Sequence, residues 1–258
     1  MTEMPVDDAM LATVAELPPA TRAAIAAHFT RRARSELRVG VAFAAMAERL
    51  AARGAPRVVV EGLARSAEEE PRHAAICVQL ATIYGGAPVP LPVGLEAPLP
   101  RFGEDDPDLE DALLVAGMCC VNETIATAWL GAGLEVATAP IAVAALRAHL
   151  AEEIGHARIG WAYLASSHVS DATRRALSAR LPAPLAANLP GWERDDEDLP
   201  PEGVPAHGHL SAAASRAAIA AAVRDLVLPG FAHVGVDPAG AEGWLGYHGG
   251  PTTKGRPR

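Results

Sequence analysis

Apolar side chains recur at intervals of three and four residues along most of the chain up to about residue 167, which is the period of an α-helix with one buried face. The pattern breaks at glycine and proline positions, where helices typically begin or end. It predicts four long helices, over about 19–54, 56–85, 108–136 and 140–167. Residues 87–107 are rich in proline and acidic residues and have no periodicity, so we expect a long crossover loop there.

Two long helices, a long crossover and two further long helices predict an antiparallel four-helix bundle over residues 1–167. The pattern weakens afterwards, and residues 168–258 are expected to form a helical extension packed on the bundle. In this extension the sequence predicts a short helix over 171–181, a surface loop over 182–208 and an Ala-rich helix over 210–229. The loop prediction rests on several prolines and on the acidic run 193–198, and a disordered basic tail is expected from residue 249.

The composition favours an all-α fold. Half of the residues are hydrophobic but only 4% are aromatic, and alanine, the best helix former, supplies much of the apolar fraction. The three cysteines, Cys77, Cys119 and Cys120, are odd in number and lie in apolar helical stretches, as expected of reduced thiols in a cytoplasmic protein. The N-terminus has no apolar signal-peptide core, and no apolar run reaches the ~18 residues of a spanning helix, so no membrane association is expected.

The charge balance argues against one class of partner. The formal net charge is −9 at pH 7 with neutral histidines, which on average repels a polyanion such as DNA or tRNA. A short basic stretch at residues 31–34 is expected to be a solvated helix face. We therefore expect no nucleic-acid partner.

Each of the four predicted helices carries one glutamate near the middle of its apolar stripe. These residues are Glu36, Glu70, Glu123 and Glu153, and histidines follow the second and fourth of them by three positions, as His73 and His156. Removing an unpaired carboxylate from water costs several kcal/mol, and no arginine or lysine lies on the stripes to pair with these acids. Two divalent cations would neutralise four carboxylates, and Glu and His at i and i+3 share one side of a helix. We therefore predict a dinuclear metal site; the alternative is a metal-free bundle whose buried polar groups satisfy one another.

The arrangement resembles the ferritin-like di-iron carboxylate superfamily, whose signature is Glu, Glu-x-x-His, Glu, Glu-x-x-His on four helices. The resemblance covers roughly residues 20–167 and implies a ferritin-like bundle that binds two iron ions, with manganese or a mixed Fe/Mn pair as alternatives. It assigns Glu36, Glu70 and His73 to one metal and Glu123, Glu153 and His156 mainly to the other. Dioxygen is the co-substrate that such a site implies.

The oxygenase members of this superfamily imply a role for two more acids. In them, the acid before each ligand glutamate holds the histidine from the other half of the site. Glu69 would then hold His156. Glu152 would hold His73 in the same way, and solvent exposure of both acids is the alternative.

The same resemblance suggests two candidate catalytic residues. Cys77 lies four residues after His73, where methane monooxygenase-like hydroxylases carry a cysteine. Thr127 lies four residues after Glu123, similar to the active-site threonine of those hydroxylases. Packing in the core is the alternative for both side chains.

Several positions near the motifs are open to two interpretations. Pro71 lies inside the first Glu-x-x-His and is expected to disturb the helix there, and Gly155 stands where these families often carry arginine. Gly40 and Gly160 lie about one turn from candidate ligands, where they could open space for dioxygen or substrate or permit close helix packing. His149 is expected to be a core or surface histidine rather than a ligand.

These features predict an oxygen-activating non-haem di-iron enzyme, an oxygenase or oxidase, that acts on a small organic substrate. Electrons would come from a separate ferredoxin or reductase. The alternatives are a ferroxidase or iron-storage protein and a peroxide-reducing or manganese catalase-like enzyme. A histidine for each metal and an extension that could shape a pocket favour the oxygenase. The sequence leaves the substrate open, and a homodimer is compatible with it.

Overall fold

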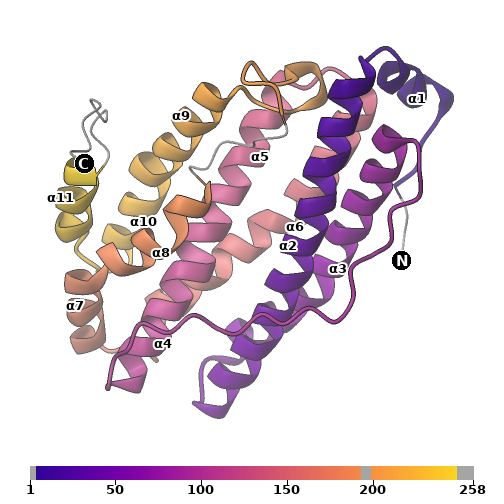
Figure 1. Ribbon diagram of the computed structural model, residues 1–258. Helices are drawn as coiled ribbons and strands as arrows, with labels where there is room; N and C mark the ends of the chain where they lie inside the picture. Colours follow the sequence, from indigo (N-terminus) through magenta and orange to yellow (C-terminus); the bar gives the residue numbers. More distant parts are fainter. Residues whose placement is uncertain (1–3, 193–198, 249–258) are drawn as a thin grey trace, which may run out of the picture.

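The computed structural model describes residues 4–192 and 199–248, and within these ranges the protein is all-α (Figure 1). The helices are α1 (Asp8–Ala15), α2 (Pro19–Ala52), α3 (Arg57–Gly85), α4 (Pro107–Val115), α5 (Thr124–Val136), α6 (Pro140–Ala165), α7 (Asp171–Arg180), α8 (Pro182–Trp192), α9 (Ala212–Ala222), α10 (Leu228–His233) and α11 (Ala239–His248), with the short helical segments η1 (Ala116–Glu123), η2 (Pro205–His207) and η3 (Val223–Val227). The described residues contain no β-strand, only an isolated bridge between Val204 and His209.

The longest helices, α2 and α3, run side by side and are joined by a short turn (Figure 1). Gly54 adopts a left-handed conformation in this turn, with φ of 76°, which a side chain would disfavour. Pro18 and Pro56 precede the first turns of the two helices, and Gly86 ends α3 in the left-handed region. Residues 87–106 then cross the molecule to the start of α4 (Figure 1). The predicted positions of these two helices and of the crossover are confirmed.

The third predicted helix is present but is not a regular α-helix. The segments α4, η1 and α5 run continuously from Pro107 to Val136, and η1 is an eight-residue stretch of π-helix. A π-helix has a wider turn than an α-helix, so it shifts the faces on which the following side chains lie. Glu123 is the last residue of η1, so this irregular stretch ends at the candidate site.

The segment Pro107–Val136 is also long and apolar enough to cross a membrane, by length and composition alone. The sequence prediction considered only uninterrupted apolar runs. It therefore did not identify this segment, in which a few polar residues interrupt an otherwise apolar stretch. Within the protein, 72% of its most apolar window is buried. This burial is what the core helix of a helical protein shows.

One large hydrophobic core joins the first part of the chain to the C-terminal part. It includes Phe43 of α2 and Leu113 of α4, which are fully buried, together with Leu177 of α7, Leu185 of α8 and Phe231 of α10. In Figure 1 the C-terminal helices lie along one side of the α4–η1–α5 segment. The C-terminal residues therefore share a core with the long helices.

The C-terminal part departs from the sequence prediction in several places. Residues 182–192 form helix α8 rather than a loop, since Pro182 occupies the first turn, where proline is tolerated, and two leucines of the helix are buried. The predicted helix over 210–229 continues through η3 to His233, and α1 and α11 were not predicted. The acidic run 193–198 and the tail from residue 249 lie outside the described residues.

Candidate metal centre

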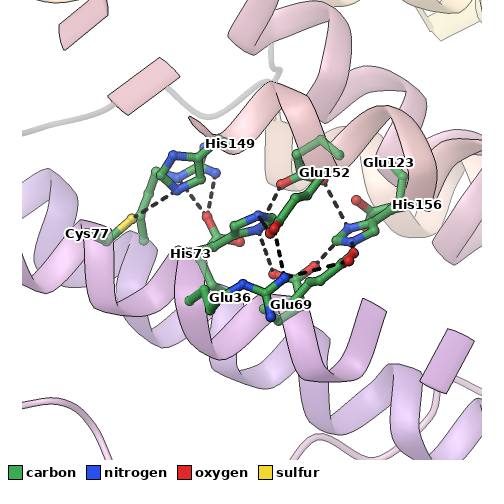
Figure 2. Close-up of polar contacts among 12 residues, drawn as sticks. Glu36, Glu69, His73, Cys77, Glu123, His149, Glu152 and His156 are labelled. Carbon is green, nitrogen blue, oxygen red and sulfur yellow. Dashed lines mark hydrogen bonds and ion pairs between the residues drawn. The ribbon is translucent and has the colours of Figure 1, made fainter. Parts of the chain in front are cut away.

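The six residues predicted to bind metal come together in the interior, where four helical segments meet (Figure 2). They are Glu36 from α2, Glu70 and His73 from α3, Glu123 from η1, and Glu153 and His156 from α6. Each of these residues is at least 94% buried, since the exposed fractions of the residues range from 1% to 6%. The prediction from the apolar faces of the helices therefore identified residues that form a buried cluster of carboxylates and imidazoles.

Both histidines direct the same ring nitrogen towards the shared carboxylates. Nδ1 of His156 lies 3.2 Å from Oε1 of Glu70 and 3.3 Å from Oε2 of Glu153. Nδ1 of His73 lies 3.4 Å from Oε2 of Glu70 and 3.5 Å from Oε1 of Glu153. The two halves of the cluster thus have similar geometry, with Glu70 and Glu153 between the two imidazoles.

The opposite ring nitrogens face two outer acids in the crossed arrangement that the resemblance implies. Nε2 of His156 lies 2.9 Å from Oε2 of Glu69 on α3, and Nε2 of His73 lies 3.0 Å from Oε2 of Glu152 on α6 (Figure 2). Arg72 reaches across to Glu152, with 2.7 Å between Nη2 and Oε1. A carboxylate on the outer nitrogen fixes the tautomer of an imidazole and raises the basicity of the inner nitrogen.

The atoms at the centre of the cluster could hold metal ions. Two groups, Glu70–Glu123–Glu153–His156 and Glu36–His73–Glu153, each have possible ligand atoms within 4.8 Å of one another, and the groups share Glu153. Oε2 of Glu70, Oε2 of Glu153 and Nδ1 of both histidines face inward and are buried without a hydrogen-bond partner among the described residues, as is the outer Nε2 of His73. Buried polar atoms are rarely left unsatisfied, so these inward-facing donor atoms fit cations between them.

The electrostatics of the cluster point the same way. Burial raises the pKa of Glu70 and of Glu123. Burial alone would raise the pKa of Glu153, but contact with His156 and the charge of His73 lower it to about 2. Burial would lower the pKa of His156, yet Glu153 and Glu70 raise it to about 11. The cluster without metal therefore retains protons that cations would displace.

The sequence-based statement that no basic residue pairs with the buried acids is wrong for Glu36. Arg32, one turn earlier on α2, donates from Nε to Oε1 of Glu36 at 3.0 Å. Its guanidinium also lies 5.5 Å from the ring centroid of Trp129, within the range of a cation–π contact. Arg32 lies at the edge of the apolar stripe, and its long side chain reaches inward. The i, i+4 spacing of Arg32 and Glu36 was the signal that could have revealed the pair.

Cys77 lies beside the cluster and next to a histidine that was not expected at the site. Its Sγ is 3.8 Å from Nε2 of His149, and both side chains are buried near Glu36 (Figure 2). Burial raises the pKa of the Cys77 thiol, and the nearby Glu36 raises it further. Burial together with the neighbouring His73 lowers the pKa of His149 to about 4.

Thr127 lies away from the clustered carboxylates. Its side chain lines a different cavity, together with Thr124 and Ile154, whereas Ala126 lines the cavity next to Glu123. The prediction placed Thr127 by counting four residues from Glu123 on a regular helix. Residues 124–127 are α-helical, so Thr127 lies one regular turn beyond Glu123 and yet lines a separate cavity.

The prolines and glycines around the motifs have clear roles in packing. Helix α3 continues through Pro71, and both Glu70 and His73 still face the cluster. A Cβ atom at Gly40 would lie 3.0 Å from Cβ of Glu70, and one at Gly160 would lie only 2.6 Å from Cβ of Cys119. These glycines therefore permit close helix packing, and Gly40 also lines a cavity of about 420 Å³.

A cavity of about 440 Å³ reaches the clustered carboxylates from one side. The four clustered glutamates line it together with residues of α8, including Asn188, Gly191 and Trp192. Trp192 donates from Nε1 to Oδ1 of Asn122 at 2.9 Å, and Nδ2 of Asn122 donates to Oε1 of Glu123 at 3.0 Å. The C-terminal part of the chain therefore forms one wall of the cavity and is hydrogen-bonded to the cluster.

No protein-family model, curated protein or solved structure compared with this chain matches it.

Proposed function

We propose that the chain is an oxygen-activating non-haem di-iron enzyme with a ferritin-like four-helix bundle, formed by α2, α3, the α4–η1–α5 segment and α6. The observation that carries the proposal is the paired orientation of His73 and His156. Both imidazoles turn Nδ1 towards shared carboxylates and Nε2 towards an outer acid. Hydrogen bonding among buried polar groups would not require inward-facing atoms without partners, whereas metal ligation does.

The six inward-facing side chains would hold two metal ions. Glu36, His73 and Glu153 form one set of donors, and Glu70, Glu123, Glu153 and His156 form the other, so Glu153 belongs to both sets. Carboxylate and imidazole donors suit iron and manganese. When bound, a reduced iron pair supplies the electrons that activate dioxygen. Glu69 and Glu152 would keep both imidazoles oriented, and Arg32 would hold one oxygen of Glu36.

The cavity beside the carboxylates favours an enzyme that acts on an organic substrate over a protein that oxidises or stores iron. Its volume, about 440 Å³, lies within the range of small-molecule pockets. Trp192 and Gly191 of α8 would contact a bound molecule, and Asn122 and Asn188 offer amide groups for hydrogen bonds. Further electrons would come from a separate ferredoxin or reductase.

The test is metal loading of matched variants under anaerobic conditions. We expect about two iron ions per chain in the wild type, the number that the carboxylate–histidine set accommodates. Glu70→Ala should lose most of this iron, because it removes a central donor. Glu68→Ala is the matched control, since Glu68 is exposed on the same helix and should leave loading unchanged. Fewer than about one ion per chain, unaffected by Glu70→Ala, would refute the site.

Oxygen kinetics then separate the kinds of activity. The proposal requires the loaded and reduced protein to consume dioxygen, and to do so repeatedly only when an electron donor is supplied. A large shell of subunits that accumulates many irons per chain would indicate storage instead. Rapid turnover of hydrogen peroxide without a donor would indicate a catalase-like enzyme.

A further inference from the structure

A third group of buried donor atoms lies at one end of the cluster. Cys77 of α3, His149 of α6 and Glu36 of α2 are 1%, 4% and 6% exposed, and their possible ligand atoms all lie within 4.8 Å of one another. In Figure 2, Cys77 and His149 lie on the side of His73 that faces away from His156. Only Glu36 of this group belongs to the proposed iron site.

The hydrogen bonds of His149 indicate which ring nitrogen is available to a ligand. Its Nδ1 lies 3.0 Å from the carbonyl oxygen of Ala145. A carbonyl only accepts hydrogen bonds, so Nδ1 carries the proton and Nε2 has a free lone pair. Nε2 points to Sγ of Cys77 at 3.8 Å. Histidines that ligate metals usually donate their other ring N–H in this way to a carbonyl or a carboxylate.

The spacing fits a tetrahedral ion. With Zn–S near 2.3 Å and Zn–N near 2.0 Å, a tetrahedral angle sets sulfur and nitrogen about 3.5 Å apart. The observed separation between Cys77 and His149 is 3.8 Å. Of the two oxygens of Glu36, Arg32 contacts only Oε1, which leaves Oε2 to approach an ion. The Arg32 guanidinium also contacts the Cys77 sulfur, where its positive charge favours the thiolate. The adjoining cavity, lined by Cys77, His149 and Arg32, has about 30 Å³, enough for one water as a fourth ligand.

We propose that Cys77, His149 and Glu36 form a site for a thiophilic divalent cation, such as Zn²⁺, next to the proposed iron pair. The set combines a soft thiolate, a borderline imidazole and a hard carboxylate, and the thiolate favours Zn²⁺ over the harder Mn²⁺. On binding, the Cys77 thiol releases its proton to solvent and the sulfur forms a bond to the ion, with no change in oxidation state. The site shares Glu36 with the proposed iron pair but does not depend on oxygen chemistry.

Cobalt is a suitable probe, because Co²⁺ replaces Zn²⁺ and a Co²⁺–thiolate bond gives charge-transfer absorption in the near ultraviolet. The full-length metal-free protein is titrated with Co²⁺ without oxygen. We expect a thiolate band that saturates, that added Zn²⁺ removes, and that is absent from Cys77→Ser. In His149→Gln the affinity reported by the band should fall at least about tenfold. Cys119→Ser is the control, since Cys119 is buried but belongs to none of the donor groups.

The outcomes separate this site from the iron pair. A thiolate band that persists in Glu70→Ala, where the pair is disrupted, supports the thiol site alone. Bound cobalt with no thiolate band at saturation refutes the thiol site and leaves the pair intact, as does a band that survives Cys77→Ser. Zinc X-ray absorption of the wild type checks the result without a variant, since a Zn–S distance of about 2.3 Å is required.

Discussion

His73 and His156 are each contacted at both ring nitrogens, and this arrangement constrains them more than burial does. Oε2 of Glu152 lies 3.0 Å from the outer nitrogen of His73, while its other oxygen accepts a hydrogen bond from Arg72. The side chain of Glu152 is 29% exposed, so its role in the core packing is small. Its effect on a bound metal should therefore be separable from its effect on folding.

We predict that Glu152→Ala weakens metal binding without unfolding the protein. Loss of the acid frees the His73 ring to rotate and lowers the basicity of Nδ1, and such outer partners typically account for about 10–100-fold in affinity. Anaerobic calorimetric titration with Fe²⁺ or Mn²⁺ measures the change, with the exposed Glu68→Ala as the control. Equal affinities in wild type and Glu152→Ala would contradict a positioning role.

Glu110 shows how one carboxylate can hold a loop that has no regular structure. Its two oxygens accept hydrogen bonds from the backbone N–H groups of Phe102, at 2.8 Å, and Glu104, at 3.0 Å. Burial by itself would raise the pKa of Glu110, but these two hydrogen bonds outweigh it and lower the pKa from 4.5. The end of the crossover is thereby attached to α4.

This lowered pKa predicts a specific acid sensitivity. The ionised form is favoured in the folded state, so its stabilising contribution is complete above about pH 4.5 and is lost as the pH falls through the folded-state value. Glu110→Gln lacks the titrating group and should lose less stability than wild type over the same acid range. Urea unfolding at a series of pH values measures both slopes, and parallel slopes would argue against the assignment.

At the scale of elements, ion pairs to a buried acid connect the C-terminal end of α2 to α4, near the turn between α2 and α3. Asp111 is fully buried and contacts Arg49, at 2.5 Å between Oδ1 and Nε, as well as Arg53. Arg53 also contacts Asp108, so two arginines of α2 bind two acids of α4. The arginines are each 30% exposed, and only the acid is wholly removed from water.

We predict that Asp111→Asn destabilises the protein by about 2 kcal/mol, because two arginines lose their buried counter-charge but can still reach water. The loss should appear as a lower urea midpoint with an unchanged slope. Glu61→Gln offers a contrast, since the Glu61–Arg57 pair is exposed and should contribute little. A midpoint for Asp111→Asn equal to that of Glu61→Gln would show that the buried pair does not stabilise the contact.

The π-helical stretch η1 is the element that connects the C-terminal part to the cluster. It ends at Glu123 and carries Asn122, which bridges Glu123 and Trp192 of α8. The wider turn presents Asn122, Glu123 and Ala126 to the same cavity. π-Helical turns often occur at functional sites, because they re-aim side chains at a cost in hydrogen-bond geometry.

At the scale of the whole molecule, the hydrophobic core does not divide at residue 167. Leu177 and Phe231 belong to the same buried cluster as Phe43 and Leu113. Removing the C-terminal part would expose this apolar surface and open the cavity wall that α8 supplies. The two parts of the chain should therefore fold as one unit.

We predict a single cooperative unfolding transition for the full chain, with coincident curves from circular dichroism and tryptophan fluorescence. A chain that ends at residue 167 should show no cooperative transition and should bind dyes that recognise exposed apolar surface. Two separated transitions in the full chain, or a stable truncated chain, would show that the parts are independent.

The sequence by itself determined the features that depend on local periodicity. The positions of the long helices follow from apolar spacing and from proline and glycine at their ends. The cluster of buried acids and histidines follows because a charge on an apolar stripe must face the interior, whatever the neighbouring helices are. A cost of several kcal/mol for an unpaired buried carboxylate makes such positions informative in one sequence.

Only the tertiary structure decided which groups meet across helices. The approach of Cys77 to His149, for example, depends on how α3 and α6 pack. The π-helical stretch η1 was also visible only in the structure, because a π-helix leaves no clear mark in the apolar pattern. Helix α8 formed in a proline-rich stretch because long-range burial of its leucines outweighed local propensity. Such contacts join residues far apart in sequence, so periodicity and spacing carry no record of them.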